Sequence, residues 1–284
     1  MEHRLELVAD GIVFGEGPRW HAGRLFFSDI RDHAVKSVAP GGKVETVVRL
    51  PGDPSGLGWL PDGRMLVVSM EDHRLLRLDP TGLVEVADLT PHCGGRANDM
   101  VVDARGRAYV GNIGFDLEAH PISPRATNLV RIDPDASVHV AAREIWCPNG
   151  LAILADGKTL VAAESAAGRL AAFDVAPDGS LARQRVFAAL PEGAAPDGIC
   201  ADADGAIWVA SPTTREFLRV REGGEVAERI PTGERVAIAC ALGGPARRTL
   251  FLVTSWTMSL AEAGKQRGGR IEACEVAVPG AGWP

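Results

Sequence analysis

A short pattern recurs six times along the 284-residue chain and constrains the fold more than any other feature. Each copy joins a turn, often Asp-Gly, to a β-rich run that ends in small residues. These segments read HAGRLFFSD, PDGRMLVVS, ARGRAYVGN, ADGKTLVAA, ADGAIWVAS and, with a longer turn, GGPARRTLFLVTS. A further β-rich run follows each one: HAVKSVAP, HRLLRLDP, TNLVRIDP, GRLAAFDV, EFLRVRE and GRIEACEV. Glycine-containing turns between such runs indicate β-hairpins.

The repeat predicts an all-β fold, a six-bladed β-propeller. An apolar run precedes each turn and a fourth β-rich run follows in most copies, as in KVETVVRL and SVHVAAR. Four strands recurring about every 40 to 50 residues are typical of a propeller blade. The last copy has no fourth run, and the amino-terminal RLELVADG can supply it and close the ring. We therefore expect four-stranded blades in a single domain spanning residues 1–284.

Composition narrows the classes of partner and the cellular location. The formal net charge is −7 and no run of Lys or Arg occurs, which argues against nucleic acid as a partner. No apolar run approaches the roughly 20 residues of a membrane span, and the start, MEHRLELVADG, lacks the apolar stretch of a signal peptide. Five cysteines without a CxxC pair indicate reduced thiols. We expect a cytoplasmic protein that acts on a small molecule.

The first strand of every blade lines the central channel, and all six begin at the same end. Residues at this repeat position therefore converge in space although they are far apart in sequence. Five of the six carry a side-chain oxygen: Glu16, Ser55, Asn98, Asn149, Asp197 and, as the exception, Ile238. The glycines after Glu16, Asn149 and Asp197 are expected to let the backbone pack closely around the site.

Two carboxylates and two carboxamides gathered at one point are unfavourable without a partner, and a divalent cation is the natural one. Glu16, Asn98, Asn149 and Asp197 are the expected ligands. Oxygen ligands suit calcium, magnesium or manganese, and they do not rank these metals. We expect one divalent metal ion, with calcium as the first candidate and zinc, manganese or magnesium as alternatives. The other interpretation is that these residues line a water-filled channel and hydrogen-bond one another.

Three further features of the sequence are expected to lie near the channel. Arg96, in GGRAND, is either a surface ion-pairing residue or a fixed cation that orients a substrate oxygen. The third repeat carries an insertion, residues 113–128, in which Asp116, Glu118 and His120 could reach the site. Cys200 and Cys240 lie on neighbouring inner strands and are expected to be close, as buried thiols rather than a catalytic nucleophile.

The chain resembles the regucalcin, gluconolactonase and luciferin-regenerating enzyme family over nearly its whole length. The matching phrases, in order, are EGPRW, RANDMVVDARGRAYVGN, PNGLAI and APDGICADADGAIWVAS. The resemblance implies a six-bladed propeller with one divalent metal ion in its channel and, commonly, lactone hydrolysis. It implies Glu16, Asn149 and Asp197 as metal ligands, Asn98 as a ligand or substrate contact, and Arg96 as a substrate-binding residue. The insertion GFDLEAHPISP departs from the sugar lactonases of the family, and Glu118 or Asp116 would take the place of their substrate-binding glutamate.

The resulting hypothesis is metal-dependent hydrolysis of a small cyclic ester, a lactonase-type reaction. The cation would polarise the carbonyl group, and Asp197 would accept a proton from the attacking water. Three alternatives stay open: a non-catalytic calcium-binding regulatory protein, a propeller enzyme of different chemistry on the same fold, and an interaction scaffold. The acids Glu16 and Asp197 on the axis count against the scaffold.

Overall fold

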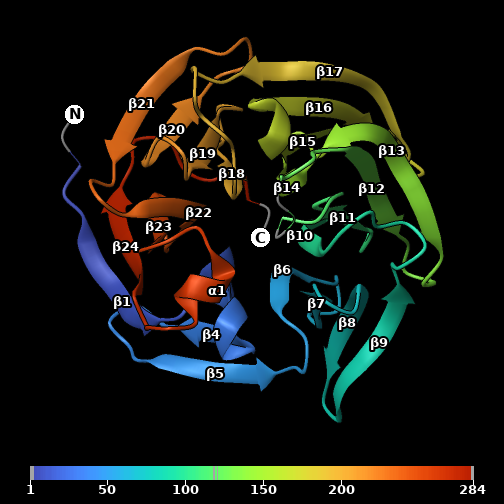
Figure 1. The fold of residues 1–284 in the computed structure, drawn as a ribbon, viewed down its shortest axis with the longest axis horizontal. Helices are drawn as coiled ribbons and strands as arrows, with labels where there is room; N and C mark the ends of the chain where they lie inside the picture. The colour runs from blue at the N-terminus through green and yellow to red at the C-terminus, as the bar shows by residue number, and fades with distance from the viewer. Residues whose placement is uncertain (1–2, 118, 120, 283–284) are drawn as a thin grey trace.

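A computed structural model describes residues 3–117, 119 and 121–282 of the chain. Within these residues, 24 strands form six four-stranded antiparallel sheets. The sheets follow one another around a central axis, as the colour gradient in Figure 1 shows. The fold is therefore the six-bladed β-propeller that the repeats predict.

The first three blades follow the order of the chain, from the axis outward. The first contains β2 (Gly15–His21), β3 (Arg24–Asp29), β4 (Ala34–Val38) and β5 (Val44–Arg49). The second contains β6 (Pro54–Trp59), β7 (Met65–Ser69), β8 (Arg74–Asp79) and β9 (Gly82–Asp88). The third contains β10 (Ala97–Val102), β11 (Ala108–Asn112), β12 (Ala126–Ile132) and β13 (Val138–Trp146). The insertion is three residues shorter than expected, because β12 begins at Ala126.

The last three blades repeat this order. The fourth contains β14 (Pro148–Ile153), β15 (Thr159–Glu164), β16 (Arg169–Val175) and β17 (Leu181–Ala189). The fifth contains β18 (Ile199–Ala201), β19 (Ile207–Ser211), β20 (Glu216–Val220) and β21 (Val226–Pro231). The sixth contains β22 (Val236–Gly243), β23 (Thr249–Ser255) and β24 (Gly269–Glu275).

The outer strand of the sixth blade comes from the start of the chain. Strand β1 (Glu6–Ile12) pairs antiparallel with β24, from Glu6 opposite Ala273 to Ile12 opposite Gly269. This pairing hides the edge of β24 that would otherwise be open to association with another chain. The predicted closure of the ring by the amino-terminal strand is confirmed.

The blades are held together by apolar side chains packed between neighbouring sheets. Val35 of the first blade, for example, shares a buried cluster with Leu57 and Val67 of the second. The strands nearest the axis are largely enclosed, and all six residues of β6 and of β10 are buried. The inner strands are therefore firmly supported where they carry polar side chains.

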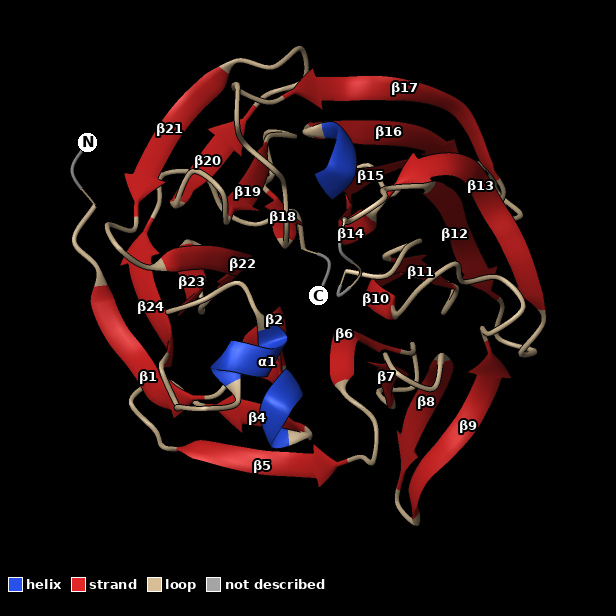
Figure 2. Ribbon diagram, in the orientation of Figure 1, coloured by secondary structure: helices blue, strands red, loops and turns tan. Residues whose placement is uncertain are grey.

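The channel has two different ends, which we name by the direction of the inner strands. At its amino end the inner strands begin, and the connections from second to third strands lie there too, since Ala97 pairs with Asn112. These connections include the 3-10 helices η1 (Ile30–Asp32) and η2 (Ser165–Ala167) and the helix α1 (Leu260–Ala263), shown in Figure 2. In the described part of the chain, no helix is long and apolar enough to cross a membrane.

Candidate functional site

The polar residues predicted to open the inner strands occupy one structural position. Glu16, Ser55, Asn98 and Asn149 are each the second residue of their strand, in β2, β6, β10 and β14. A register shift follows each of them in the pairing with the neighbouring strand. Such bulges turn a side chain away from the regular alternation of a strand. The repeat thus places four polar side chains at the amino end of the channel.

Asp197 reaches this position from a different local structure. It lies two residues before β18, in an irregular segment held by hydrogen bonds from Asp197 N to Ala210 O (2.9 Å) and from Gly198 N to Ile238 O (2.9 Å). Asp197 therefore lies next to the polar residue of the preceding blade, Asn149, although no strand begins at Asp197. Ile238, the apolar exception, is buried in β22.

Glycine allows the inner strands to approach each other at the site. A Cβ atom on Gly150 would lie 2.5 Å from Ile199 N and 2.6 Å from Asp197 O. Gly150 N donates a hydrogen bond to Asp197 O (3.2 Å) across the two blades. A larger residue at 150 would push the fourth and fifth blades apart, which supports the expected role of the glycines that follow the polar residues.

Asn149 and Asp197 are in direct contact. Asn149 Nδ2 donates a hydrogen bond to Asp197 Oδ1 at 2.5 Å. The other end of this carboxamide, Asn149 Oδ1, is buried and has no hydrogen-bond partner among the described residues. A buried oxygen without a donor is unfavourable, so its place beside a carboxylate points to a bound cation or another donor.

Glu16 lies in the same buried, negatively charged environment as Asp197. It is buried, and its Oε2 accepts a hydrogen bond from Gly17 N (2.7 Å). Burial raises the pKa of Glu16 well above its usual value, and the negative charges of Asp197 and Asp99 raise it further. Burial also raises the pKa of Asp197 to about 7, against the opposing effect of the hydrogen bond from Asn149. Two carboxylates therefore lie close enough to repel each other.

Asn98 is fixed by its neighbour from the second blade. Ser55 Oγ donates a hydrogen bond to Asn98 Oδ1 (3.2 Å), and Ser28 Oγ donates to Ser55 O (2.6 Å). Ser55 is fully enclosed and Asn98 is buried. Ser55 thus orients the carboxamide of Asn98 and spans the gap between neighbouring inner strands.

The predicted substrate-binding residues lie around the amino end. Arg96, one residue before β10, forms an ion pair with Glu71 (Nε to Oε1, 3.0 Å), in the connection between β7 and β8. Asp116 is exposed in the insertion. Glu118 and His120 fall outside the described residues, so their expected contacts stay predictions.

Two functional neighbours were missed by sequence reasoning. Asp99, next to Asn98 in β10, faces the site closely enough to raise the pKa values of Glu16 and Asp197. Its charge is balanced by Arg19 of β2, whose Nη2 lies 2.8 Å from Asp99 Oδ1. Both residues stand within phrases that were recognised, EGPRW and RAND, and a search for charges of opposite sign inside those phrases could have found them.

The donor set fits a hard divalent cation. Glu16, Asn98, Asn149 and Asp197 offer carboxylate and carboxamide oxygens, which calcium and magnesium prefer. In the part of the chain that the structure describes, no three His, Cys, Asp or Glu side chains gather at one point. The carboxamides are therefore essential to any metal site here, above all the free Oδ1 of Asn149.

Comparison with known proteins identifies the family of the chain. The family model described as SMP-30/gluconolactonase/LRE-like region matches residues 14–256, which include every polar residue of the site. The chain belongs to this family. The match ends shortly before α1, so that helix and the rest of the sixth blade lie outside the matched region.

Several known proteins are similar to most of the chain. A 6-deoxy-6-sulfogluconolactonase from Pseudomonas putida is 26% identical over 98% of this chain and 96% of its own. Regucalcin from Xenopus laevis is 25% identical over 92% of this chain and 89% of its own. The crystal structure of a calcium-binding protein, regucalcin from Agrobacterium tumefaciens, superposes with a TM-score of 0.80 at 20% identity, over 99% of this chain and 96% of that one.

Proposed function

We propose that this protein is a divalent-metal-dependent hydrolase of small cyclic esters, a lactonase. The observation that carries the proposal is the buried, unpartnered Oδ1 of Asn149 beside two carboxylates that repel each other. A cation would satisfy all three groups at once. The name of the Pseudomonas putida relative supports the lactone class of substrate.

Glu16, Asn149 and Asp197 would hold the metal ion, with Asn98 as a fourth ligand or a substrate contact. Calcium is the first candidate because every donor is an oxygen atom, and because the Agrobacterium tumefaciens structure is described as a calcium-binding protein. Zinc, manganese and magnesium are the alternatives. When bound, such a cation polarises the carbonyl group of an ester and favours attack by water.

Asp197 would act as the general base. Only one of its carboxylate oxygens, Oδ1, accepts a hydrogen bond from a described residue. The other oxygen is available to take a proton from the attacking water. Asn149 holds the carboxylate in position, since its Nδ2 donates to Oδ1 at 2.5 Å.

Arg96, Asn98 and Glu118 would orient the substrate at the amino end of the channel. Arg96 is tied to Glu71 at 3.0 Å, which limits the directions its guanidinium can take. The hydrogen bond from Ser55 does the same for Asn98 (3.2 Å). Rigid polar groups near the reacting centre favour one orientation of the lactone ring over others.

The test combines metal depletion with two matched substitutions. Protein treated with a chelator is assayed against D-gluconolactone and an aliphatic γ-lactone, before and after calcium is returned, and calcium binding is measured by calorimetry. We expect calcium to restore hydrolysis in the wild type, and Asp197→Asn to abolish it. Asp178→Asn, in an exposed turn, is the control and should keep full activity.

The same assay separates the alternatives. If the wild type binds calcium, Asp197→Asn weakens that binding and neither lactone is hydrolysed, the protein is a non-catalytic calcium-binding protein. Full hydrolysis by chelator-treated Asp197→Asn protein would refute both the metal and the base. Esters or other substrates that turn over in place of lactones would indicate a different chemistry on this fold.

A further inference from the structure

A cavity lies at the opposite end of the channel from the candidate site. Strand β2 begins near Glu16 at the amino end and finishes with Trp20 and His21 at the carboxyl end, where both line this cavity of about 300 Å³. Strand β18 likewise leads away from Asp197 to Cys200 and Ala201 in its wall. The volume is at the lower end of the range for small-molecule sites.

The carboxyl-terminal segment builds one wall of this cavity. Hydrogen bonds fix it along the fifth and sixth blades: Ala203 N donates to Pro279 O (2.8 Å), Gly280 N to Arg247 O (2.8 Å) and Ala281 N to Ala201 O (3.0 Å). The sequence gives no sign of this role, because VPGAGWP lies beyond the last repeat. The wall is therefore preformed rather than left to a free chain end.

The charged residues that line the cavity are both basic. They are Arg19 and Arg247, and the described lining contains no Asp or Glu. Burial lowers the pKa of His21, so its ring is neutral near pH 7, and it stacks on Trp59 with ring centroids 4.3 Å apart.

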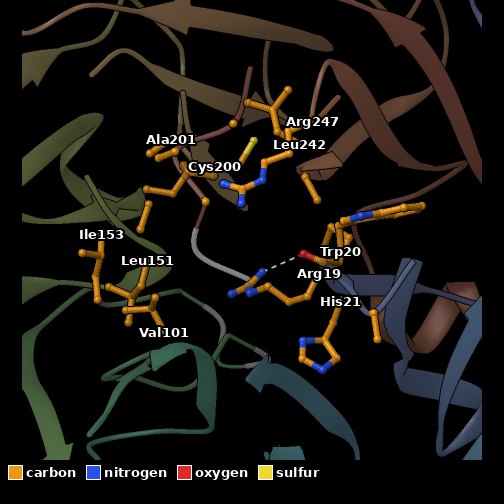
Figure 3. A pocket seen from close by; sticks show the side chains of 18 residues that line it. Arg19, Trp20, His21, Val101, Leu151, Ile153, Cys200, Ala201, Leu242 and Arg247 are labelled. Carbon is orange, nitrogen blue, oxygen red and sulfur yellow. Dashed lines mark hydrogen bonds between the residues drawn. The ribbon is translucent and has the colours of Figure 1, made fainter. Parts of the chain in front are cut away.

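The two arginines differ in what already binds them. Arg19 is buried, and its Nη2 contacts both Asp99 oxygens (2.8 and 3.0 Å) and Met100 O (2.7 Å). Arg247, in the turn between β22 and β23, has an exposed side chain that makes no hydrogen bond or ion pair with any described residue. Figure 3 shows the guanidinium groups of Arg19 and Arg247 extending into the cavity from different sides. The uncompensated charge is therefore that of Arg247.

The remaining walls are apolar. Val101, Leu151 and Ile153 stand on one side of the view in Figure 3, and Leu242 near Arg247. Apolar walls favour an organic body, while a guanidinium binds a carboxylate through two parallel hydrogen bonds. A single free cation matches one negative charge better than the two of a phosphate monoester.

We propose that this cavity is a binding site for a small organic monocarboxylate with an apolar body, and that Arg247 is its charge partner. The site uses no residue of the candidate metal site. The Arg19–Asp99 ion pair and Met100 lie between the two. The proposal therefore stands whether or not the protein hydrolyses lactones.

Calorimetry with a matched pair of probes tests the charge requirement. Benzoate and benzamide have nearly the same shape, and only benzoate is charged. We expect benzoate to bind with one site per chain and benzamide at least about tenfold more weakly, as for loss of one charge-assisted hydrogen-bonded pair. Equal binding of the two probes, or no binding of benzoate at millimolar concentration, would overturn the proposal.

Two arginine variants test the residue. Arg247→Gln should weaken benzoate binding about tenfold. Arg248→Gln, the next residue in the same exposed turn and not part of the lining, should leave it unchanged. Unchanged melting temperatures would show that both variants are folded. Wild-type affinity in Arg247→Gln would rule out the assigned charge partner.

Cysteine labelling tests the location independently of Arg247. Cys200 is half-buried and lines the cavity, whereas Cys240, Cys147 and Cys274 are buried. Benzoate bound in the cavity should slow alkylation of Cys200 several-fold, measured by peptide mass spectrometry, and leave Cys93 unaffected. Alkylation of Cys200 at the same rate with and without saturating benzoate would place the ligand elsewhere.

Discussion

Arg19 and Asp99 form a buried ion pair that joins the first blade to the third across the channel. Arg19 Nη2 lies 2.8 and 3.0 Å from the two carboxylate oxygens of Asp99, and it also donates to Met100 O at 2.7 Å. The negative charge of Asp99 raises the pKa values of Glu16 and Asp197 at one end of the channel. Arg19 lines the cavity at the other end. The pair thus lies between the candidate site and the cavity at the other end of the channel.

Removal of either partner should be strongly destabilising, because it leaves the other charge buried and unpaired. We expect Arg19→Met and Asp99→Asn each to lower the free energy of unfolding by roughly 3–5 kcal/mol, and the double variant by clearly less than their sum. Urea denaturation followed by circular dichroism measures this. Arg221→Met is the control, since its pair with Glu225 (2.9 Å) is exposed and should contribute less than about 1 kcal/mol. Additive effects would show that the two side chains are not coupled.

The close approach of the fourth and fifth blades predicts that Gly150 cannot be enlarged. Gly150→Ala should lower the free energy of unfolding by about 1–3 kcal/mol, because its Cβ would overlap Ile199 N and Asp197 O. It should also weaken calcium binding, since it displaces Asp197. Gly264→Ala is the matched control: its Cβ would have no neighbour nearer than 3.7 Å, and its φ of −61° suits alanine. Thermal denaturation and calcium titration of both variants decide the point.

The repulsion at the candidate site predicts that Glu16→Gln stabilises the protein without metal and destabilises it, relative to the wild type, with calcium. Burial, and then the charges of Asp197 and Asp99, raise the pKa of Glu16. Ionised Glu16 therefore destabilises the metal-free fold at neutral pH, and Glu16→Gln should raise its free energy of unfolding by about 0.5–2 kcal/mol in the presence of a chelator.

With calcium added, the wild type should become more stable than Glu16→Gln. The wild type should gain about 2.7 kcal/mol at free calcium 100 times its dissociation constant, and Glu16→Gln much less. Melting curves with chelator and with calcium provide both comparisons. A Glu16→Gln variant that is less stable than the wild type without metal would contradict the proposed repulsion.

The ion pair of Asp32 with Arg267 links the first blade to the last, and we expect this link to weaken in acid. Burial alone would raise its pKa, but hydrogen bonds from Lys36 and Arg267 outweigh burial and lower the pKa to about 2. Arg267, in the connection between α1 and β24, contacts Asp32 Oδ1 at 2.6 Å. A carboxyl group whose pKa is lowered in the folded state stabilises the fold at pH values above its usual pKa of 3.8. That stabilisation is lost as the pH falls toward 2.

Asp32→Asn should therefore lower the free energy of unfolding by about 0.5–1 kcal/mol near neutral pH, since the pair is partly exposed. The difference from the wild type should shrink between about pH 4 and pH 2. Urea denaturation at several pH values tests this. Asp10→Asn, an exposed residue of β1 without a described partner, should show no such trend. A constant difference at all pH values would exclude the ionic origin.

Much of the architecture could be predicted from the repeats because each blade is a local unit. Turn residues and β-rich runs recur at a fixed spacing, so they specified six blades and the closure of the ring by β1. The expected proximity of Cys200 and Cys240 is confirmed, with their Sγ atoms 3.7 Å apart. The same reasoning found the positions of Glu16, Asn98 and Asn149, since register in a repeat is a property of the sequence.

Contacts between distant blades could not be predicted in this way. The Arg19–Asp99 pair and the carboxyl-terminal wall beside Arg247 depend on how the ring closes, and no local pattern records which residues then face each other. Asp197 illustrates both cases. Its position in the repeat can be seen in the sequence, but its hydrogen bond with Asn149 forms only when the fourth and fifth blades pack together. Strand periodicity is local, so the residues at the start of the inner strands can be derived from the repeats alone. Charge and hydrogen bonding act through space rather than along the chain, so the partners of these residues emerge only when the blades assemble.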